Sequence, residues 1–344
     1  MKPSINTSFY NQIIDLLQGA RNSLVRAVNQ TMVMTYFKIG EKIIEEEQNG
    51  NERAEYGKNL LQGLSNVLTK EFGKGFSVTN IQQMRNFYLA YEKQQTLSVK
   101  SENSIKQTAS AIFNLSWSHY LILMRIDNKD ERQFYEIEAT KNNWSVRELD
   151  RQINSSLYER LSISKDKKEI VKLSQKGQII EKASDLIKDP YILEFLNLPE
   201  LNSYSETELE EELINKLEHF LLELGKGFTF VGRQVRFTFD EEHFRVDLVF
   251  YNRLLKCFVL LDLKIGKLKH QDLGQMQMYV NYYDRYVKLE EENKTIGIIL
   301  CKDKKDTLVE ITLPENNNQI FASKYELILP SKNELKQLIE NKTI

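Results

Sequence analysis

The spacing of hydrophobic residues predicts a helical first half of the chain. Over residues 9–47, apolar side chains recur at intervals of three and four, as at Ile13, Leu17, Leu24 and Val28. That interval is the repeat of one face of an α-helix. A second helix is predicted over residues 57–72, where leucines fall on one face.

A third helix is predicted to begin near Ser77, a residue suited to cap the first helical turn. The tight turn GKGFS separates it from the second helix. Two helices joined in this way are compatible with a helix-turn-helix DNA reader, and equally with an ordinary helical hairpin. If the element reads DNA, the outward polar side chains that would meet it include Asn80, Gln83 and Arg85.

The second half of the chain alternates between helix and strand patterns. The predicted elements are, in order, a helix over 205–227, strands over 228–239, 243–251 and 257–265, a helix over 272–292 and a strand over 295–301. A further strand within residues 320–330 is expected at an edge of the sheet. The order α-β-β-β-α-β indicates an α/β domain.

These patterns predict an α+β protein with two domains, which suits a length of 344 residues. We expect an all-α N-terminal domain over residues 1–160 and a connecting helical segment over 161–205. An α/β domain would follow over 206–344.

Composition narrows the class of protein. The net charge of −2 excludes a globally basic nucleic-acid binder, so any basic surface must be local. Cys257 and Cys301 lie in strand-like runs, which favours a reducing cytosol over a disulfide framework. The N-terminus lacks the apolar core of a signal peptide. No apolar run reaches the roughly 20 residues that span a bilayer, so a cytoplasmic protein without a membrane is expected.

The stretch CFVLLDLKI carries charge inside an apolar strand. Side chains alternate across a strand, so Leu260, Asp262 and Lys264 share one face. On the preceding strand, Asp247 points away from an apolar face formed by Phe244, Val246, Leu248 and Phe250. If the two strands pair as a hairpin, both carboxylates can reach one site.

Two close carboxylates repel each other, and a divalent cation removes that penalty. Mg²⁺ prefers oxygen ligands, so Asp247 and Asp262 are candidate ligands, with the backbone carbonyl of Leu263 as a further one. A bound metal would activate water against a phosphodiester, and Lys264 would stabilise the developing charge. The alternative is a structural Asp–Lys ion pair, although desolvation leaves such a pair little net stability.

A local basic surface surrounds these strands in the sequence, as a phosphate-backbone partner requires. The candidate DNA contacts in this half are Arg233, Arg245, Arg253, Lys267 and Lys269.

At these residues the sequence resembles the PD-(D/E)XK nuclease superfamily, and in particular the bacterial YhcG-type (DUF1016) proteins. The likeness covers nearly the whole chain and includes GKGFSVTNIQQMRNFY, VDLVFYNRLLKCFVLLDLKIGKLK and GQMQMY. It implies a winged-helix or helix-turn-helix N-terminal domain followed by a restriction-endonuclease-like domain with a mixed central sheet.

The resemblance also implies site residues. The strand Asp of the family pattern falls on Asp247, and the (D/E)xK pair falls on Asp262 and Lys264. The helix glutamine falls on Gln275. The glutamate of the first core helix, a further metal ligand, falls on Glu210, while Glu211 and Glu212 are adjacent alternatives.

Two positions depart from the family pattern. Val246 replaces its proline, and Asp262 stands where relatives usually carry the longer Glu.

The function that the resemblance implies is a Mg²⁺-dependent DNA endonuclease, with Mn²⁺ able to substitute and no organic cofactor. Roles in DNA recombination, repair, restriction or defence against mobile DNA are consistent with it. A homodimer or higher homo-oligomer is expected. The rivals are a non-catalytic DNA-binding or assembly protein, which the Asp at 262 favours, and an RNase on the same scaffold.

Overall fold

The chain forms two compact units, residues 1–150 and 151–344. The computed structural model describes residues 7–49, 54–99, 113–163, 167–198, 204–239, 241–329, 331–333, 335 and 337. Buried hydrophobic clusters lie within each unit, so each has a core of its own.

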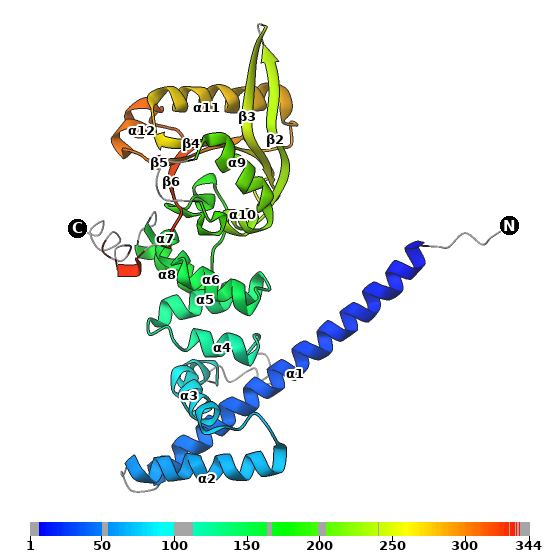
Figure 1. Cartoon of the computed structure of the whole chain (residues 1–344), viewed down its shortest axis with the longest axis vertical. Helices are drawn as coiled ribbons and strands as arrows, with labels where there is room; N and C mark the ends of the chain where they lie inside the picture. The colour runs from blue at the N-terminus through cyan, green and yellow to red at the C-terminus, as the bar shows by residue number, and fades with distance from the viewer. Residues whose placement is uncertain are drawn as a thin grey trace, which may run out of the picture. The chain divides into compact units, whose positions relative to one another are not determined.

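The described residues of the first unit are helical or in turns, as predicted. Its helices are α1 (Thr7–Asn49), α2 (Ala54–Phe72), α3 (Val78–Val99), α4 (Trp117–Leu123), α5 (Lys129–Lys141) and the first part of α6 (Val146–Asn154). They are coloured blue to green in Figure 1.

Helices α1 and α3 approach each other closely at Gly40. A side-chain carbon at that position would collide with the backbone carbonyl of Met84 on α3, so only glycine permits this crossing. Nearby, Phe37 of α1 packs edge-on against Phe87 of α3, with ring centroids 5.8 Å apart. Phe113 packs against both rings, which completes a buried aromatic cluster.

The turn between α2 and α3 has the predicted cap. The Ser77 hydroxyl accepts a hydrogen bond from the Asn80 backbone N–H at 3.3 Å, and α3 begins at the next residue, Val78. The Ser65 hydroxyl of α2 donates to the Phe76 carbonyl at 2.8 Å, which fixes the turn against the preceding helix.

The second unit combines helices with one six-stranded sheet. Its elements after α6 are α7 (Leu157–Ile163), α8 (Lys167–Lys176), β1 (Tyr191–Ile192), α9 (Glu206–Asn215), α10 (Leu217–Leu224), β2 (Phe228–Phe239), β3 (Glu242–Asn252), β4 (Cys257–Lys267), α11 (His270–Tyr282), β5 (Ile296–Asp303), α12 (Asp306–Thr312) and β6 (Ile320–Glu326), with short 3-10 turns at Ala183–Leu186 and Glu194–Leu196 and a π turn at Tyr283–Val287.

The strand order across the sheet is β1-β6-β5-β4-β3-β2. Strands β2, β3 and β4 pair antiparallel, whereas β4, β5, β6 and β1 pair parallel. The sheet is therefore mixed, as predicted, and the whole protein is α+β.

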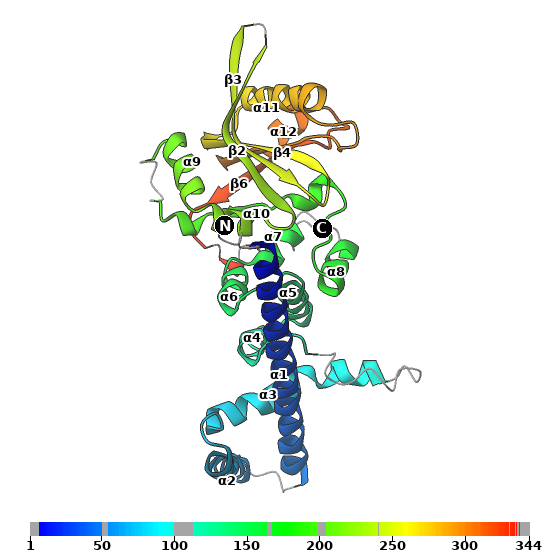
Figure 2. The same ribbon diagram turned by 90° about the vertical axis from the view of Figure 1, so that its right-hand side faces the viewer.

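Helices cover both faces of this sheet. One buried cluster joins α9 and α10 to β4 and β5, through residues such as Leu213, Phe220 and Leu261. The other joins α11 to the opposite face, through residues such as Leu260, Met276 and Ile299. Figures 1 and 2 show α11 and α9 on opposite sides of the strands. Because both faces are covered, β4 is buried continuously from Val259 to Leu263.

Three details of the predicted fold are wrong. The single helix expected over 205–227 divides into α9 and α10, because Lys216 leaves helical geometry. Strand β6 does not lie at the edge, since the two-residue β1 pairs beyond it. The expected apolar face of β3 splits: Leu248 and Phe250 pack toward α9 and α10, but Val246 packs toward α11.

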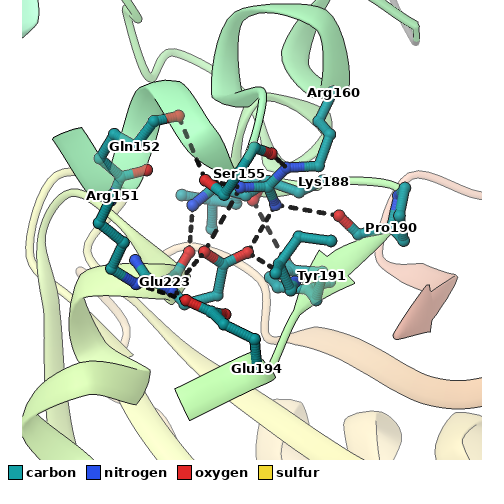
Figure 3. Close-up of polar contacts among 11 residues, drawn as sticks. Arg151, Gln152, Ser155, Arg160, Lys188, Pro190, Tyr191, Glu194 and Glu223 are labelled. Atoms are coloured by element: carbon teal, nitrogen blue, oxygen red, sulfur yellow. Dashed lines mark hydrogen bonds and ion pairs between the residues drawn. The ribbon is translucent and has the colours of Figure 1, made fainter. Parts of the chain in front are cut away.

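The segment 161–205, expected to be a connection, contributes α8, β1 and part of α7 to the second unit. A buried network of charges holds the chain around it to α10 (Figure 3). Arg160 of α7 donates to the Glu223 carboxylate at 2.6 Å and to the Pro190 carbonyl at 3.0 Å. The same carboxylate accepts from the Ile192 backbone N–H of β1 at 3.0 Å. Arg160 and Glu223 are both fully buried.

Candidate functional site

Strands β3 and β4 separate at a fork, and the charged side chains of both strands meet there. The two strands are paired from Asn252, which lies opposite Cys257, to Leu248, which lies opposite Leu261. Beyond that point β3 pairs only with β2, and β4 only with β5. The next residues along the two strands are Asp247 and Asp262. The Asp247 carboxylate accepts the Leu263 backbone N–H at 2.8 Å, replacing the ladder bond that the fork removes.

A glutamine connects Asp247 to helix α9. The side-chain amide of Gln234, on β2, donates to Asp247 at 3.1 Å and also to the Glu210 carboxylate. Glu210 is buried, whereas its neighbour Glu211 is exposed and Glu212 pairs with Lys216 at 3.7 Å. Of the three glutamates considered from the sequence, Glu210 is therefore the one at the fork.

Asp262 and Glu210 at the fork have pKa values above the ordinary range. Burial raises the pKa of Asp262 to about 7, and the negative charge of Asp247 adds to the effect. Burial also raises the pKa of Glu210, assisted by Asp247 and opposed by the Gln234 hydrogen bond. Desolvation and like charge both disfavour the ionised form, so the fork concentrates negative charge at a cost in energy.

Lys264 is the cation closest to Asp262. Its ammonium lies 2.8 Å from the Asp262 Oδ2 atom as an ion pair, and that oxygen has no partner in regular hydrogen-bond geometry. Burial lowers the pKa of Lys264, but the Asp262 carboxylate outweighs it and the net shift is upward. Lys264 therefore stays protonated at neutral pH, which suits charge stabilisation and not proton abstraction.

Helix α11 brings Gln275 to the same region. The Gln275 amide donates to the Tyr279 hydroxyl. Burial raises the pKa of Tyr279, and the charges of Asp262 and Asp247 contribute to that rise, which locates the hydroxyl near the fork. The ring of Tyr279 also packs edge-on against Phe237, with centroids 5.4 Å apart.

Sequence reasoning missed two residues at the fork. Gln234 has a positive φ of 48° within β2, just after the irregularity between Phe230 and Gly232. Glu206, at the start of α9, accepts the Ile265 backbone N–H at 3.3 Å and lies 3.9 Å from the Lys264 ammonium. Its spacing of four residues from Glu210, which places both on one helix face, was the available signal.

The side chains at the fork suit a hard divalent cation in their chemistry. All of the acidic groups offer oxygen, the donor that Mg²⁺ prefers, and the buried Asp262 Oδ2 atom is held by the ion pair with Lys264 and not by regular hydrogen bonds. In the part of the chain that the structure describes, however, no three His, Cys, Asp or Glu side chains lie close enough to form a ready-made metal site. Glu210 and Asp247 are instead joined through the Gln234 amide, which donates to both carboxylates.

The predicted basic residues are not gathered at one place. Arg233 lies near enough to Glu210 to lower its pKa, against the net upward shift. Arg253 lies in the turn at the other end of β3, six residues from Asp247 or about 20 Å along an extended strand. The remaining three candidates, Arg245, Lys267 and Lys269, are exposed.

In the first unit, two of the three candidate base readers are engaged within the unit. The Asn80 side chain donates to the Gly75 carbonyl and accepts from the Trp117 indole at 3.0 Å. Arg85 donates to both carboxylate oxygens of Glu47, at 2.9 and 2.8 Å. Both side chains therefore have partners within the unit, as polar groups at helix contacts usually do, and their role as DNA contacts stays a prediction. Gln83 lines a shallow groove of about 470 Å³ between α3 and α4.

The second unit has the sequence features of a PD-(D/E)XK nuclease domain. Residues 184–340 match the family model described as "YhcG PDDEXK nuclease domain". Residues 12–160 match the "DUF1016 N-terminal domain". A protein of Escherichia coli (strain K12) described as "Putative nuclease YhcG" is 41% identical over 344 aligned residues, which cover 95% of this chain and 91% of that protein. The chain therefore belongs to the YhcG family of PD-(D/E)XK nuclease proteins.

Solved structures resemble only part of the chain. A "repair endonuclease from Pyrococcus abyssi" covers 38% of this chain and 50% of its own, with 17% identity and a TM-score of 0.26. A structure of "EndoMS in apo form" covers 38% and 49%, with 18% identity and a TM-score of 0.24. Among the described helices, none is long and apolar enough to cross a membrane.

Proposed function

We propose that this protein is a Mg²⁺-dependent DNA endonuclease whose active centre is the fork between β3 and β4. The observation that supports it best is the convergence of Asp247, Asp262 and Glu210 beside the single ammonium of Lys264. Structural carboxylates are normally paired, but burial raises the pKa of Asp262 and of Glu210, and the charge of Asp247 adds to both effects. Perturbed carboxyl groups of this kind mark functional sites more often than structural ones.

Asp247, Asp262 and Glu210 would hold the metal ion, with the Leu263 carbonyl as a further donor. The bound ion supplies Lewis-acid polarisation of the phosphodiester and a more acidic water. Mn²⁺ has the same preference for oxygen and can substitute.

Lys264 remains protonated and is placed to stabilise negative charge on the phosphate oxygens in the transition state. Gln275 has a second amide hydrogen to offer a phosphate or water beside Tyr279. Gln234 keeps Glu210 and Asp247 together before the metal binds.

The exposed basic residues, led by Arg233 and Arg245, would contact the DNA backbone. The first unit would add DNA binding through α2 and α3, or hold together a homodimer. Roles in DNA repair, recombination, restriction or defence are consistent with such an activity.

The test is cleavage of linear, branched and single-stranded DNA, with RNA alongside, in Mg²⁺, in Mn²⁺ and in chelator. The wild type should cut DNA only with metal, and Asp262→Ala should abolish cutting. Lys264→Ala should lower the rate by about 10²–10³-fold, the usual loss of one electrostatic contact.

Glu210 and Glu211 provide a matched pair on one helix. Glu210→Gln should impair cleavage, whereas Glu211→Gln removes the same charge from an exposed neighbour and should not. DNA binding without cleavage by the wild type would favour the non-catalytic rival, and preferential cutting of RNA would favour the RNase.

A further inference from the structure

A groove of about 710 Å³ lies beside the fork, between the end of β2 and the outer face of α11. Thr238 and Phe239 form one wall. The other wall is formed by Gly274, Gln277, Met278, Asn281, Tyr282, Arg285 and Tyr286. The volume lies within the range of about 300–1,000 Å³ that holds flat organic groups. Figure 1 shows α11 running beside the outer part of the β2–β3 ribbon.

The chemistry of the groove is unusual for a surface. Tyr286 is 73% exposed and Phe239 is 39% exposed. Single exposed apolar side chains are common, but apolar side chains gathered in one patch with a polar rim mark interaction sites, and the groove has this arrangement. Arg285 supplies one cation, and none of the described residues that line the groove carries a carboxylate.

The aromatic rings continue from the groove to the fork. Tyr286 packs against Tyr282 at 5.3 Å, and Tyr282 stacks on Phe237 at 4.1 Å between ring centroids. Phe237 in turn contacts Tyr279, whose hydroxyl accepts from Gln275. Helix α11 thus presents one face to the candidate active centre and an adjacent face to the groove.

A π turn at Tyr283–Val287 positions the last part of this wall. Its wider winding follows the regular helix directly, and it carries both Arg285 and Tyr286. Such turns are uncommon and frequently occur at functional sites.

We propose that this groove binds unpaired nucleotides of a DNA substrate, with bases stacked on Tyr286 and Phe239 and a phosphate held by Arg285. Proteins bind single strands by stacking bases on aromatic side chains next to a cation. Bases in a duplex are already stacked on one another and do not offer these faces. The inference rests on the proposed nuclease function, and it names the substrate class: DNA with a single-stranded portion next to the cleavage point.

Binding is measured in chelator, where no cleavage occurs, by fluorescence anisotropy of labelled DNA with the full chain. The probes are a short thymidine strand, an abasic strand and an RNA strand of the same length, and a duplex. The wild type should bind the thymidine strand more tightly than the abasic strand, because only the former has bases to stack.

Tyr286→Ala should weaken binding of the thymidine strand by about 5- to 100-fold, the loss of one stacked base. Its affinity for the duplex should stay within about twofold of the wild-type value, which corresponds to less than about half a kcal/mol. Tyr286→Trp should keep the affinity. The matched control is Ile311→Ala, which removes an apolar side chain that is 80% exposed on α12, outside the groove and outside the first unit.

Equal affinity of Tyr286→Ala and wild type for the thymidine strand would overturn the proposal. Equal binding of abasic and thymidine strands, or tighter binding of an RNA strand than of DNA, would also overturn it. Because the assay needs no metal, base-dependent binding that Tyr286→Ala abolishes would support the groove even if the chain cut no DNA. Cleavage without that dependence would support the nuclease and reject the groove.

Discussion

The second unit contains two clusters of buried charge that are built from similar side chains and end in opposite electrostatic states. At Glu223, burial alone would raise the pKa, but Arg160, Lys188 and Arg151 hold it at about 2. At the fork, Asp262 has one cation and another carboxylate beside it, and its pKa rises to about 7.

The two clusters differ in whether their buried negative charge is compensated, and this difference distinguishes a structural network from a candidate binding site. The Glu223 carboxylate is matched by cations and backbone donors, so the network joins α7, β1 and α10 (Figure 3). The fork leaves part of its negative charge uncompensated, which lowers stability. A bound cation would remove that cost. Sites that bind or react commonly carry such a cost.

The largest expected effect is on stability at Glu223. Glu223→Gln leaves the buried Arg160 guanidinium without its counter-charge and should lower the free energy of unfolding by about 3–5 kcal/mol. Asp262→Asn relieves the repulsion with Asp247 and should leave that free energy unchanged or raise it. Urea denaturation followed by circular dichroism measures both.

Glu211→Gln is the control for loss of one exposed carboxylate and should stay within about 0.5 kcal/mol of wild type. If Asp262→Asn costs as much as Glu223→Gln, the fork is a structural ion pair and the comparison fails.

Part of the fold and of the candidate site can be predicted from the sequence. The bounds of β2 follow from alternation alone, and the hairpin of β3 and β4 follows from two strand patterns around a turn. Asp247 and Asp262 could be paired because a hairpin fixes which residues face each other. The fork itself could not be predicted, since divergence of two strands leaves no local pattern.

Long-range partners explain the other omissions. Gln234 has a positive φ, and its side chain donates to carboxylates on two other elements. Neither feature leaves a periodic pattern in the sequence. Strand β1 has two residues, too few for a strand signal, and exists because β6 pairs with it. Lys216 interrupts an otherwise regular helix, and its ammonium donates to the Phe195 carbonyl at 2.9 Å.

An intermediate effect is expected at Gln234. Gln234→Ala removes the amide that holds Glu210 and Asp247, so affinity for Mg²⁺ should fall by about 10–100-fold, as for other residues that orient metal ligands. The Mg²⁺ dependence of cleavage measures this, with isothermal titration as a check that needs no activity.

Gln234→Gly separates the side chain from the backbone. Glycine accepts the positive φ without strain, so this variant should be more stable than Gln234→Ala by about 1 kcal/mol. The affinity of Gln234→Gly for Mg²⁺ should fall as much as that of Gln234→Ala. Unchanged affinity in both variants would show that Gln234 does not organise the site.

The smallest effect is on the pH dependence of stability. The folded-state pKa of Asp262, about 7, is above its ordinary value of 3.8. The folded protein therefore keeps a proton that the unfolded chain has lost, and stability should decline as pH rises from about 4 to about 7. Glu223 has the opposite sign: its stabilisation is present above its ordinary value of 4.5 and is lost as pH falls toward about 2. Between about pH 5 and pH 8 the Glu223 network should not contribute, whereas Glu136 of the first unit, whose pKa burial raises to about 7, should add a decline of the same sign.

Thermal unfolding in chelator and in Mg²⁺ tests this separation. Without metal, the melting temperature should fall across that range by a few degrees, since about 1 kcal/mol corresponds to roughly 2–4 °C in a domain of this size. Mg²⁺ binds the ionised carboxylates, so its stabilising effect should grow with pH and cancel the decline. In the Asp262→Asn variant the substituted side chain cannot ionise, so the slope in chelator should be smaller than in the wild type, and the remainder is the contribution expected from Glu136. If that variant keeps the wild-type slope, another group titrates in this range, and the raised pKa of Asp262 is not what sets the fork apart from the Glu223 network.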